Sequence, residues 1–198
     1  MQDYESIESK GVNLWGKTQD AERWKIFRIG TAAHNVLMVD GQQQQVEGKA
    51  SIVLARPGRT VIDTGEIYRG QLAQARRGVA LQEDRSVVVQ DEVKALGQAA
   101  SVRWAMVTRA DVTIDGTGAA TLTQDGKRLA FRVVEPAGAT VKIFPTDPPP
   151  GPIDARNPGT RMVGFEVAVA AGAAQRIVVQ LVPGGAGKAP EVKALAAW

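Results

Sequence analysis

The fold class is decided by the stretch DVTIDGTGAATLTQDGKRLAFRVV, which occupies residues 111–134. It contains three short runs of alternating apolar and polar or β-branched residues, separated by the pairs Asp115-Gly116 and Asp125-Gly126. Alternation with a period of two is typical of half-buried antiparallel strands. An Asp-Gly pair between two such runs is typical of a tight hairpin turn. The stretch therefore predicts antiparallel strands joined by hairpins.

The same pattern continues on both sides of this stretch. The further predicted strands are Ala50–Leu54, Thr60–Ile62, Ser86–Gln90, Ser101–Val107, Thr140–Ile143, Val163–Ala170 and Gln175–Val182. The run His34–Val39 is closed by another Asp-Gly pair, and Ile67–Ala75 is the best helical candidate, although Gly65 and Gly70 weaken it. Many short strands at this spacing predict an all-β fold, an antiparallel two-sheet β-sandwich.

The 198 residues are predicted to form one β-sandwich domain, residues 1–198. Residues 1–45 differ from the rest because they are rich in aromatic residues and poor in β-branched runs. Residues 144–160 contain six prolines, which cannot continue a central strand, so a long loop is expected there. Residues 183–198 are rich in Gly and Ala and are predicted to form a flexible tail.

Composition excludes several classes of site and partner. The 24 basic and 21 acidic residues are scattered and give a net charge of only +3, so a nucleic-acid partner is not expected. There is no cysteine, which excludes disulfides, thiolate metal sites and a cysteine nucleophile. The polar start carries no signal peptide, and no apolar run reaches membrane-spanning length, so no membrane partner is expected.

His34 is the only histidine in the sequence. On its own it is more typical of a structural side chain than of a metal ligand, because a metal site normally needs three protein ligands. A Ser-His-Asp triad is formally open, but the Gly-x-Ser-x-Gly turn that supports it is missing, and so are phosphate-binding loops. The run Gln42–Gln45 is expected to be a solvated hairpin loop.

Trp15 and Trp24 are the candidates for stacking on sugar rings, because aromatic faces bury the apolar C–H faces of pyranoses. Arg28 lies near Trp24 in sequence, together with Arg23 and Lys25, and cations beside an aromatic ring suit an acidic sugar. Core packing and a solvated charged face remain the alternatives. Trp104 alternates with apolar residues, which predicts a core position.

The segment Arg28–Gly41, followed by Gln42–Gln45, resembles an element of the heparinase II/III-like family. The family has Arg-x-x-x-x-x-His-Asn-Thr-hydrophobic-x-hydrophobic-Asp-Gly, commonly followed by Gln, and Val36 here replaces the Thr. The opening Asp3–Gly11 and the pair Arg76–Val79 and Val89–Glu92 also resemble family segments. The resemblance covers most of the chain and implies a β-sandwich of the polysaccharide-lyase C-terminal type.

The resemblance further implies a lyase that cleaves uronic-acid polysaccharides by β-elimination, in the periplasm or outside the cell. The acidic polysaccharide, a glycosaminoglycan or alginate, is then the expected partner. In the full-length family context His34 becomes a zinc ligand, but its partner ligands would lie upstream of Met1, as would the catalytic toroid. A lone imidazole binds zinc weakly, so this chain is expected neither to hold zinc nor to cleave by itself.

Three partners or roles therefore follow from the sequence. The first is an upstream catalytic domain, for which this chain is the C-terminal sandwich and supplies no catalytic residue. The second is a non-catalytic carbohydrate-binding domain that uses Trp15, Trp24 and Arg28. The third is an assembly domain that forms a homo-oligomer through an exposed apolar patch.

Overall fold

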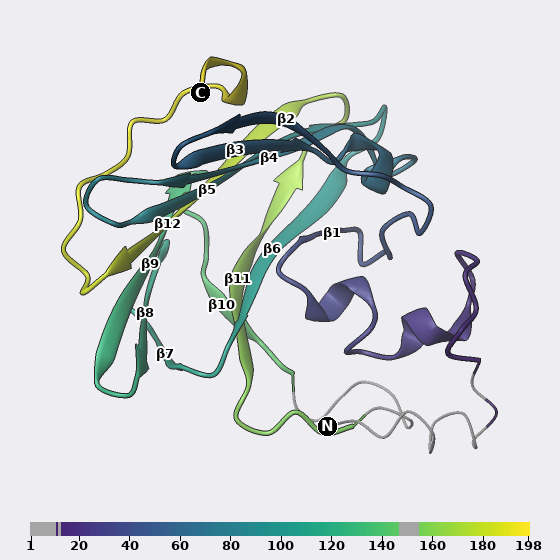
Figure 1. Ribbon diagram of the computed structural model, residues 1–198, viewed down its shortest axis with the longest axis horizontal. Coiled ribbons are helices and arrows are strands. Elements are labelled where there is room, and N and C mark those ends of the chain that lie inside the picture. The colour runs from purple at the N-terminus through teal and green to yellow at the C-terminus, as the bar shows by residue number, and fades with distance from the viewer. Residues whose placement is uncertain (1–10, 12, 147–154) are drawn as a thin grey trace.

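The alternating runs of the sequence fold into two antiparallel sheets in the computed structural model, which describes residues 11, 13–146 and 155–198 (Figure 1). The smaller sheet has the order β1-β6-β11-β10 and the larger sheet the order β2-β3-β4-β5-β12-β9-β8-β7. Every strand pair is antiparallel. The predicted two-sheet β-sandwich is thus confirmed.

The strands of the smaller sheet are β1 (Leu37–Val39), β6 (Ala100–Thr108), β11 (Arg161–Val169) and β10 (Lys142–Phe144). The strands of the larger sheet are β2 (Ser51–Arg56), β3 (Arg59–Asp63), β4 (Leu72–Leu81), β5 (Val87–Ala95), β12 (Ala174–Pro183), β9 (Lys127–Glu135), β8 (Ala119–Gln124) and β7 (Asp111–Ile114). The described residues also form four short 3-10 helices: η1 (Glu22–Lys25) and η2 (Thr31–Ala33) before β1, η3 (Gly65–Tyr68) between β3 and β4, and η4 (Leu195–Ala197) after β12.

The β8–β9 hairpin shows why the Asp-Gly pairs predict turns. Asp125 and Gly126 have φ angles of 51° and 72°, so both central residues of the turn lie in the left-handed region. A two-residue turn of this type matches the right-handed twist of the flanking strands, and Asp and Gly tolerate it best. The two residues that flank the turn, Gln124 and Lys127, are already paired with each other.

The core lies between the two sheets, and Trp104 is at its centre. Trp104 on β6 is 4% exposed, as its position in an apolar run predicts. Its ring centre lies 6.1 Å from that of Phe165 on β11 and 5.6 Å from that of Phe131 on β9, in the other sheet. The three rings therefore join both layers of the sandwich, and aromatic pairs at these distances stabilise beyond their area burial.

The weak helical candidate Ile67–Ala75 does not form a helix. Residues 65–68 form the single turn η3, and β4 begins at Leu72 and continues to Leu81. The pattern was misleading because β4 carries Arg76, Arg77 and Gly78 in its middle, where a strand pattern would show β-branched residues. Tertiary contacts described below explain Arg77 and Gly78.

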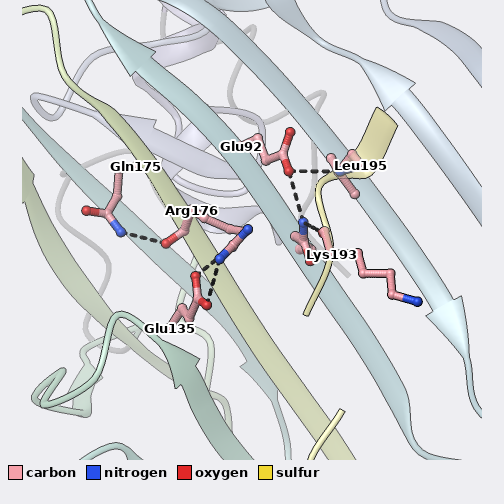
Figure 2. Close-up of polar contacts among 7 residues, drawn as sticks. Glu92, Glu135, Gln175, Arg176, Lys193 and Leu195 are labelled. Atoms are coloured by element: carbon pink, nitrogen blue, oxygen red, sulfur yellow. Dashed lines mark hydrogen bonds and ion pairs between the residues drawn. The ribbon is translucent and has the colours of Figure 1, made fainter. Parts of the chain in front are cut away.

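The C-terminal segment differs from the predicted flexible tail, because it packs on the outer face of the larger sheet. Leu195 is 2% exposed, and its backbone N–H donates to Glu92 Oε1 at 2.8 Å (Figure 2). Gln90 Nε2 donates to the Lys193 carbonyl at 2.8 Å, and Gln180 Nε2 donates to that of Lys188 at 2.7 Å. The segment thus covers the small apolar cluster of Ala80, Val88 and Val178, with Val192 and Trp198 packed against it.

The inner face of the larger sheet extends beyond the smaller sheet. The pairing register places Ile52, Ile62, Val79 and Leu81 on one face, the same face that carries Arg77. Ile52 is 67%, Leu81 58% and Val79 38% exposed. We call the three residues Ile52, Val79 and Leu81 the apolar strip. It results from a sheet of eight strands being covered by one of four.

Candidate functional site

The segment around His34 is held by hydrogen bonds from both sheets. The Asn35 side-chain oxygen accepts from the Val107 N–H of β6 at 2.9 Å, and the Asn35 carbonyl accepts from Arg77 of β4 at 2.7 Å. On the other side of His34, the Ala32 carbonyl accepts from Arg103 of β6 at 2.9 Å. Ala32 and Asn35, on either side of His34, are therefore fixed, while the side chain of His34 is exposed.

Two glutamines hold η2 from the opposite side, so the prediction of a solvated loop at Gln42–Gln45 is wrong for them. Gln43 accepts from the Thr31 N–H at 2.7 Å and donates to the Trp24 carbonyl at 2.6 Å. Gln44 donates its backbone N–H to Thr31 Oγ1 at 3.0 Å and its side-chain amide to Tyr68 at 2.8 Å. Nothing in the sequence distinguishes these amides from those of a solvated glutamine run.

A buried ion pair lies below the segment. Arg77 on β4 and Asp91 on β5 form two hydrogen bonds of 2.7 and 3.0 Å, and the Asp91 side chain is only 2% exposed. Burial acts to lower the pKa of the Arg77 guanidinium, but the charge of Asp91 and its hydrogen bonds with Arg77, together with the nearby Tyr68, outweigh burial and raise this pKa above its ordinary value. Since Arg77 also donates to the Asn35 carbonyl, the pair supports the backbone next to His34.

His34 lines a hollow of about 320 Å³ together with Trp24, Thr31 and Gln43–Gln45. No group of three or more His, Cys, Asp or Glu side chains in the described ranges, residues 11, 13–146 and 155–198, is arranged to hold a metal ion. A zinc ion normally takes three or four such ligands. These ranges therefore do not fit a zinc site at His34, and no chemical step is assigned to a metal.

The two predicted sugar-stacking tryptophans differ in exposure and in what covers them. Trp15 is 74% exposed and borders a small hollow with Leu14, Arg23 and Ile29. Trp24 is half-buried, donates its ring N–H to the Thr18 carbonyl at 2.9 Å, and has the Arg23 guanidinium carbon 4.7 Å from its ring centre. One face of Trp24 is thus covered by a cation, while the exposed Trp15 keeps more of its surface in solvent.

Arg28 lies apart from both tryptophans in a third hollow, of about 620 Å³, which we call the basic hollow. Its walls come from three parts of the chain and include Phe27, Arg28, Arg109, Thr146, Arg156 and Asn157. No Asp or Glu is among the described residues that line it. Sequence analysis singled out Arg28 alone, because Arg109 and Arg156 lie far from it along the chain.

Arg28 also has a structural role in the basic hollow. Its Nε donates to the Asn157 side-chain oxygen, and its Nη2 donates to the Arg156 carbonyl at 2.7 Å. The Asn157 amide in turn donates to the Thr146 carbonyl at 3.1 Å. Arg28 therefore ties the end of the Pro-rich stretch, at Arg156 and Asn157, to the N-terminal part of the chain. Residues 147–154 of that stretch lie outside the described residues.

Tyr68 is the tyrosine of the described ranges, and it is not placed to act as a base. Its ring is 3% exposed, and its hydroxyl donates to the Leu37 carbonyl at 2.9 Å. Burial raises the pKa of Tyr68 to about 12 against the opposing effect of the hydrogen bond from Gln44. A buried phenol with such a pKa stays protonated near neutral pH.

Comparison with known proteins identifies the family. The family model described as "Heparinase II/III-like, C-terminal" matches residues 7–163, which is most of the chain. The chain belongs to the heparinase II/III-like C-terminal family. The match includes the His34–Asn35 segment, the basic residues Arg28 and Arg109, and the strands up to the start of β11 in this heparinase II/III-like domain. No curated protein matches the chain.

Solved structures of a heparinase III and of a heparan sulfate lyase share the fold of this heparinase II/III-like domain. A heparinase III matches with a TM-score of 0.58 and 15% identity, over 76% of this chain and 23% of its own. A heparan sulfate lyase from Pedobacter heparinus matches with a TM-score of 0.57 and 14% identity, over 80% of this chain and 25% of its own. The chain thus spans about a quarter of the length of each, and at this identity the likeness shows the fold alone.

No helix of the described residues is long and apolar enough to cross a membrane. The sequence predicted no membrane partner, and that prediction stays a prediction.

Proposed function

We propose that this domain is the sandwich part of a lyase that cleaves uronic-acid polysaccharides by β-elimination, and that by itself it binds the polysaccharide without cleaving it. The observation that carries the proposal is the basic hollow, which lies beside the His34–Asn35 segment in a member of the heparinase II/III-like family. Guanidinium groups form paired hydrogen bonds with carboxylate and sulfate, the anionic groups of such polymers.

The chemistry of β-elimination explains why binding alone is proposed. A base must remove the proton at C5 of the uronate while a cation or hydrogen-bond donor neutralises the adjacent carboxylate. The double bond between C4 and C5 then forms as the C4–O bond breaks, and the leaving oxygen takes up a proton. Tyr68 is buried and holds its proton, so it supports no role as the base. Arginines of the basic hollow supply the neutralising part of the reaction, while the base is expected from a separate catalytic domain.

An elimination assay tests this proposal. The purified chain is mixed with heparan sulfate or with alginate, with and without added zinc, and the ultraviolet absorbance of the unsaturated product is followed. We expect no absorbance increase with either polymer, and retention of the chain on an immobilised acidic polysaccharide at low salt.

A matched variant makes the assay decisive. If absorbance increases and the increase is lost in His34→Ala, the chain carries its own base and the proposal is wrong. If the chain neither cleaves nor is retained on the acidic polymer at low salt, the binding part of the proposal is wrong. His34 is exposed, so the substitution is expected to leave folding unchanged.

Assembly is a second candidate function, favoured by the apolar strip. Ile52, Val79 and Leu81 expose apolar surface on one open sheet face next to β2, which is an edge strand. Exposed apolar faces and open sheet edges promote association. In a solution of the isolated chain, only a second copy of the chain is present to cover this face. This candidate function therefore predicts a homodimer.

A further inference from the structure

The basic hollow gathers three arginines that are far apart in the sequence. Arg28 comes from the N-terminal part, Arg109 from the turn that follows β6, and Arg156 from the segment before β11. Like charges repel when they are brought together, and no carboxylate lines the hollow among the described residues. Such an arrangement is favourable when an anion occupies it.

The three arginines differ in what they already bind. Arg28 uses its Nε and Nη2 to hold Asn157 and the Arg156 backbone, so it mainly shapes the wall. Arg109 is exposed and makes no hydrogen bond or ion pair with any residue in the described ranges. Its planar guanidinium can therefore present two parallel donors to one carboxylate or sulfate group.

The size and walls of the hollow match a sugar unit. Its volume of about 620 Å³ falls in the range of about 300–1,000 Å³ that is usual for small-molecule sites. Half-buried Phe27 adds an aromatic wall, and aromatic rings bury the apolar C–H faces of pyranoses. Thr146 and Asn157 add polar groups to the same walls.

We infer that the basic hollow is a subsite for one anionic sugar residue, in which Arg109 binds the carboxylate or sulfate group directly and Arg28 is a positioning residue. The inference rests on the proposed function, and it goes beyond it by assigning the contact to Arg109, a residue that no sequence motif marks. Arg156 also lines the hollow, and its backbone carbonyl accepts the hydrogen bond that holds Arg28.

The test measures the affinity of a heparin tetrasaccharide by calorimetry for the wild type and three variants. We expect Arg109→Ala to weaken binding about tenfold, because a charge-assisted hydrogen-bonded pair is lost. Arg109→Lys keeps the charge without the planar fork, so an intermediate loss of about threefold is expected. The control Arg59→Ala removes one exposed arginine at the start of β3, outside the hollow, and should change the affinity less than about twofold.

Two further ligands identify what the subsite recognises. A non-sulfated uronate tetrasaccharide, such as one from alginate, is expected to depend on Arg109 in the same way, whereas a neutral tetrasaccharide should not bind. Inorganic sulfate separates a sugar subsite from a bare anion site: it is expected to bind at least about tenfold more weakly than the tetrasaccharide, because it lacks the contact with Phe27. Equal binding of sulfate and tetrasaccharide would overturn the assignment of a sugar.

The outcomes distinguish this inference from the proposed function. If the wild type binds the acidic tetrasaccharides and Arg109→Ala lowers the affinity for them no more than Arg59→Ala does, the assignment of the subsite is wrong. The proposed function then still stands. If the wild type binds no acidic oligosaccharide, both are wrong. Circular dichroism of each variant checks the fold, which substitution of the exposed Arg109 should leave intact.

Discussion

At the scale of single residues, the buried Tyr68 gives the protein a pH dependence of stability that can be measured. Its hydroxyl is enclosed by the Leu37 carbonyl and the Gln44 amide, and the ring contacts the main core. Burial raises the pKa of Tyr68 to about 12, from an ordinary value of 10.0. The folded protein therefore favours the protonated phenol, which contributes stability that is fully present below the unfolded pKa and is lost as pH rises through the folded one.

We predict that Tyr68→Phe lowers stability at neutral pH but removes part of the fall in stability that the wild type shows as the pH rises. Near pH 8 the variant should be less stable by about 1–3 kcal/mol, because Gln44 and the Leu37 carbonyl lose a partner. Near pH 11 the free energy of unfolding of the wild type should have fallen by roughly 1 kcal/mol through ionisation of Tyr68, a loss that the variant does not show. Urea unfolding at both pH values measures the two differences. A stability difference that stays constant up to about pH 11 contradicts the raised pKa.

At the scale of elements, the C-terminal segment and the outer face of β4 fit each other at Gly78. A Cβ atom added to Gly78 would lie 2.8 Å from the ring of Trp198 and closer still to Leu195. A side chain at position 78 would therefore push η4 off the sheet. The glycine in the middle of β4, which weakens the strand pattern in the sequence, is required by this close approach.

We predict that Leu195→Ala and Gly78→Ala each release the C-terminal segment. Both should increase protease cleavage and amide exchange in residues 184–198, and their effects should not add, because they remove the same contact. The loss in unfolding free energy for Leu195→Ala is expected at about 1–2 kcal/mol, below the usual cost in a closed core, because a terminal segment can detach alone. Limited proteolysis with mass spectrometry measures the release.

The control for the C-terminal segment is Ala196→Ser, which changes an exposed residue of the same turn. It should leave cleavage at the wild-type rate. If Leu195→Ala is also cleaved at that rate, the packing of η4 does not protect the segment and its contacts contribute little.

At the scale of the whole molecule, the mismatch between eight and four strands leaves the apolar strip open. We predict that the isolated chain forms a homodimer at micromolar concentration, and that Ile52→Lys combined with Leu81→Lys gives a monomer, because buried lysines without partners are costly. The control Ile143→Lys changes an exposed isoleucine on β10 of the other sheet and should leave the dimer intact. Size-exclusion chromatography with light scattering measures the mass. A wild type that stays monomeric at all concentrations rules out the assembly candidate.

Much of the fold could be predicted from the sequence, because strands and tight turns are set locally. The alternation in residues 111–134 and the left-handed φ angles at Asp125-Gly126 need only neighbouring residues, so β7, β8 and β9 lie where the pattern places them. The His34–Asn35 segment could be recognised by its resemblance to a family. The core position of Trp104 followed from the alternation in its own strand.

The tertiary structure alone decided the features that join distant parts of the chain. Strand order determines which polar residues meet, and a period of two does not encode it, so the Arg77–Asp91 pair and the contacts of Gln43 and Gln44 had no sequence signal. The basic hollow exists because the sandwich brings residues 28, 109 and 156 together. The docking of Leu195 depends in the same way on a glycine more than a hundred positions earlier, because burial is decided by what the fold places opposite a residue and not by the residue's neighbours in sequence.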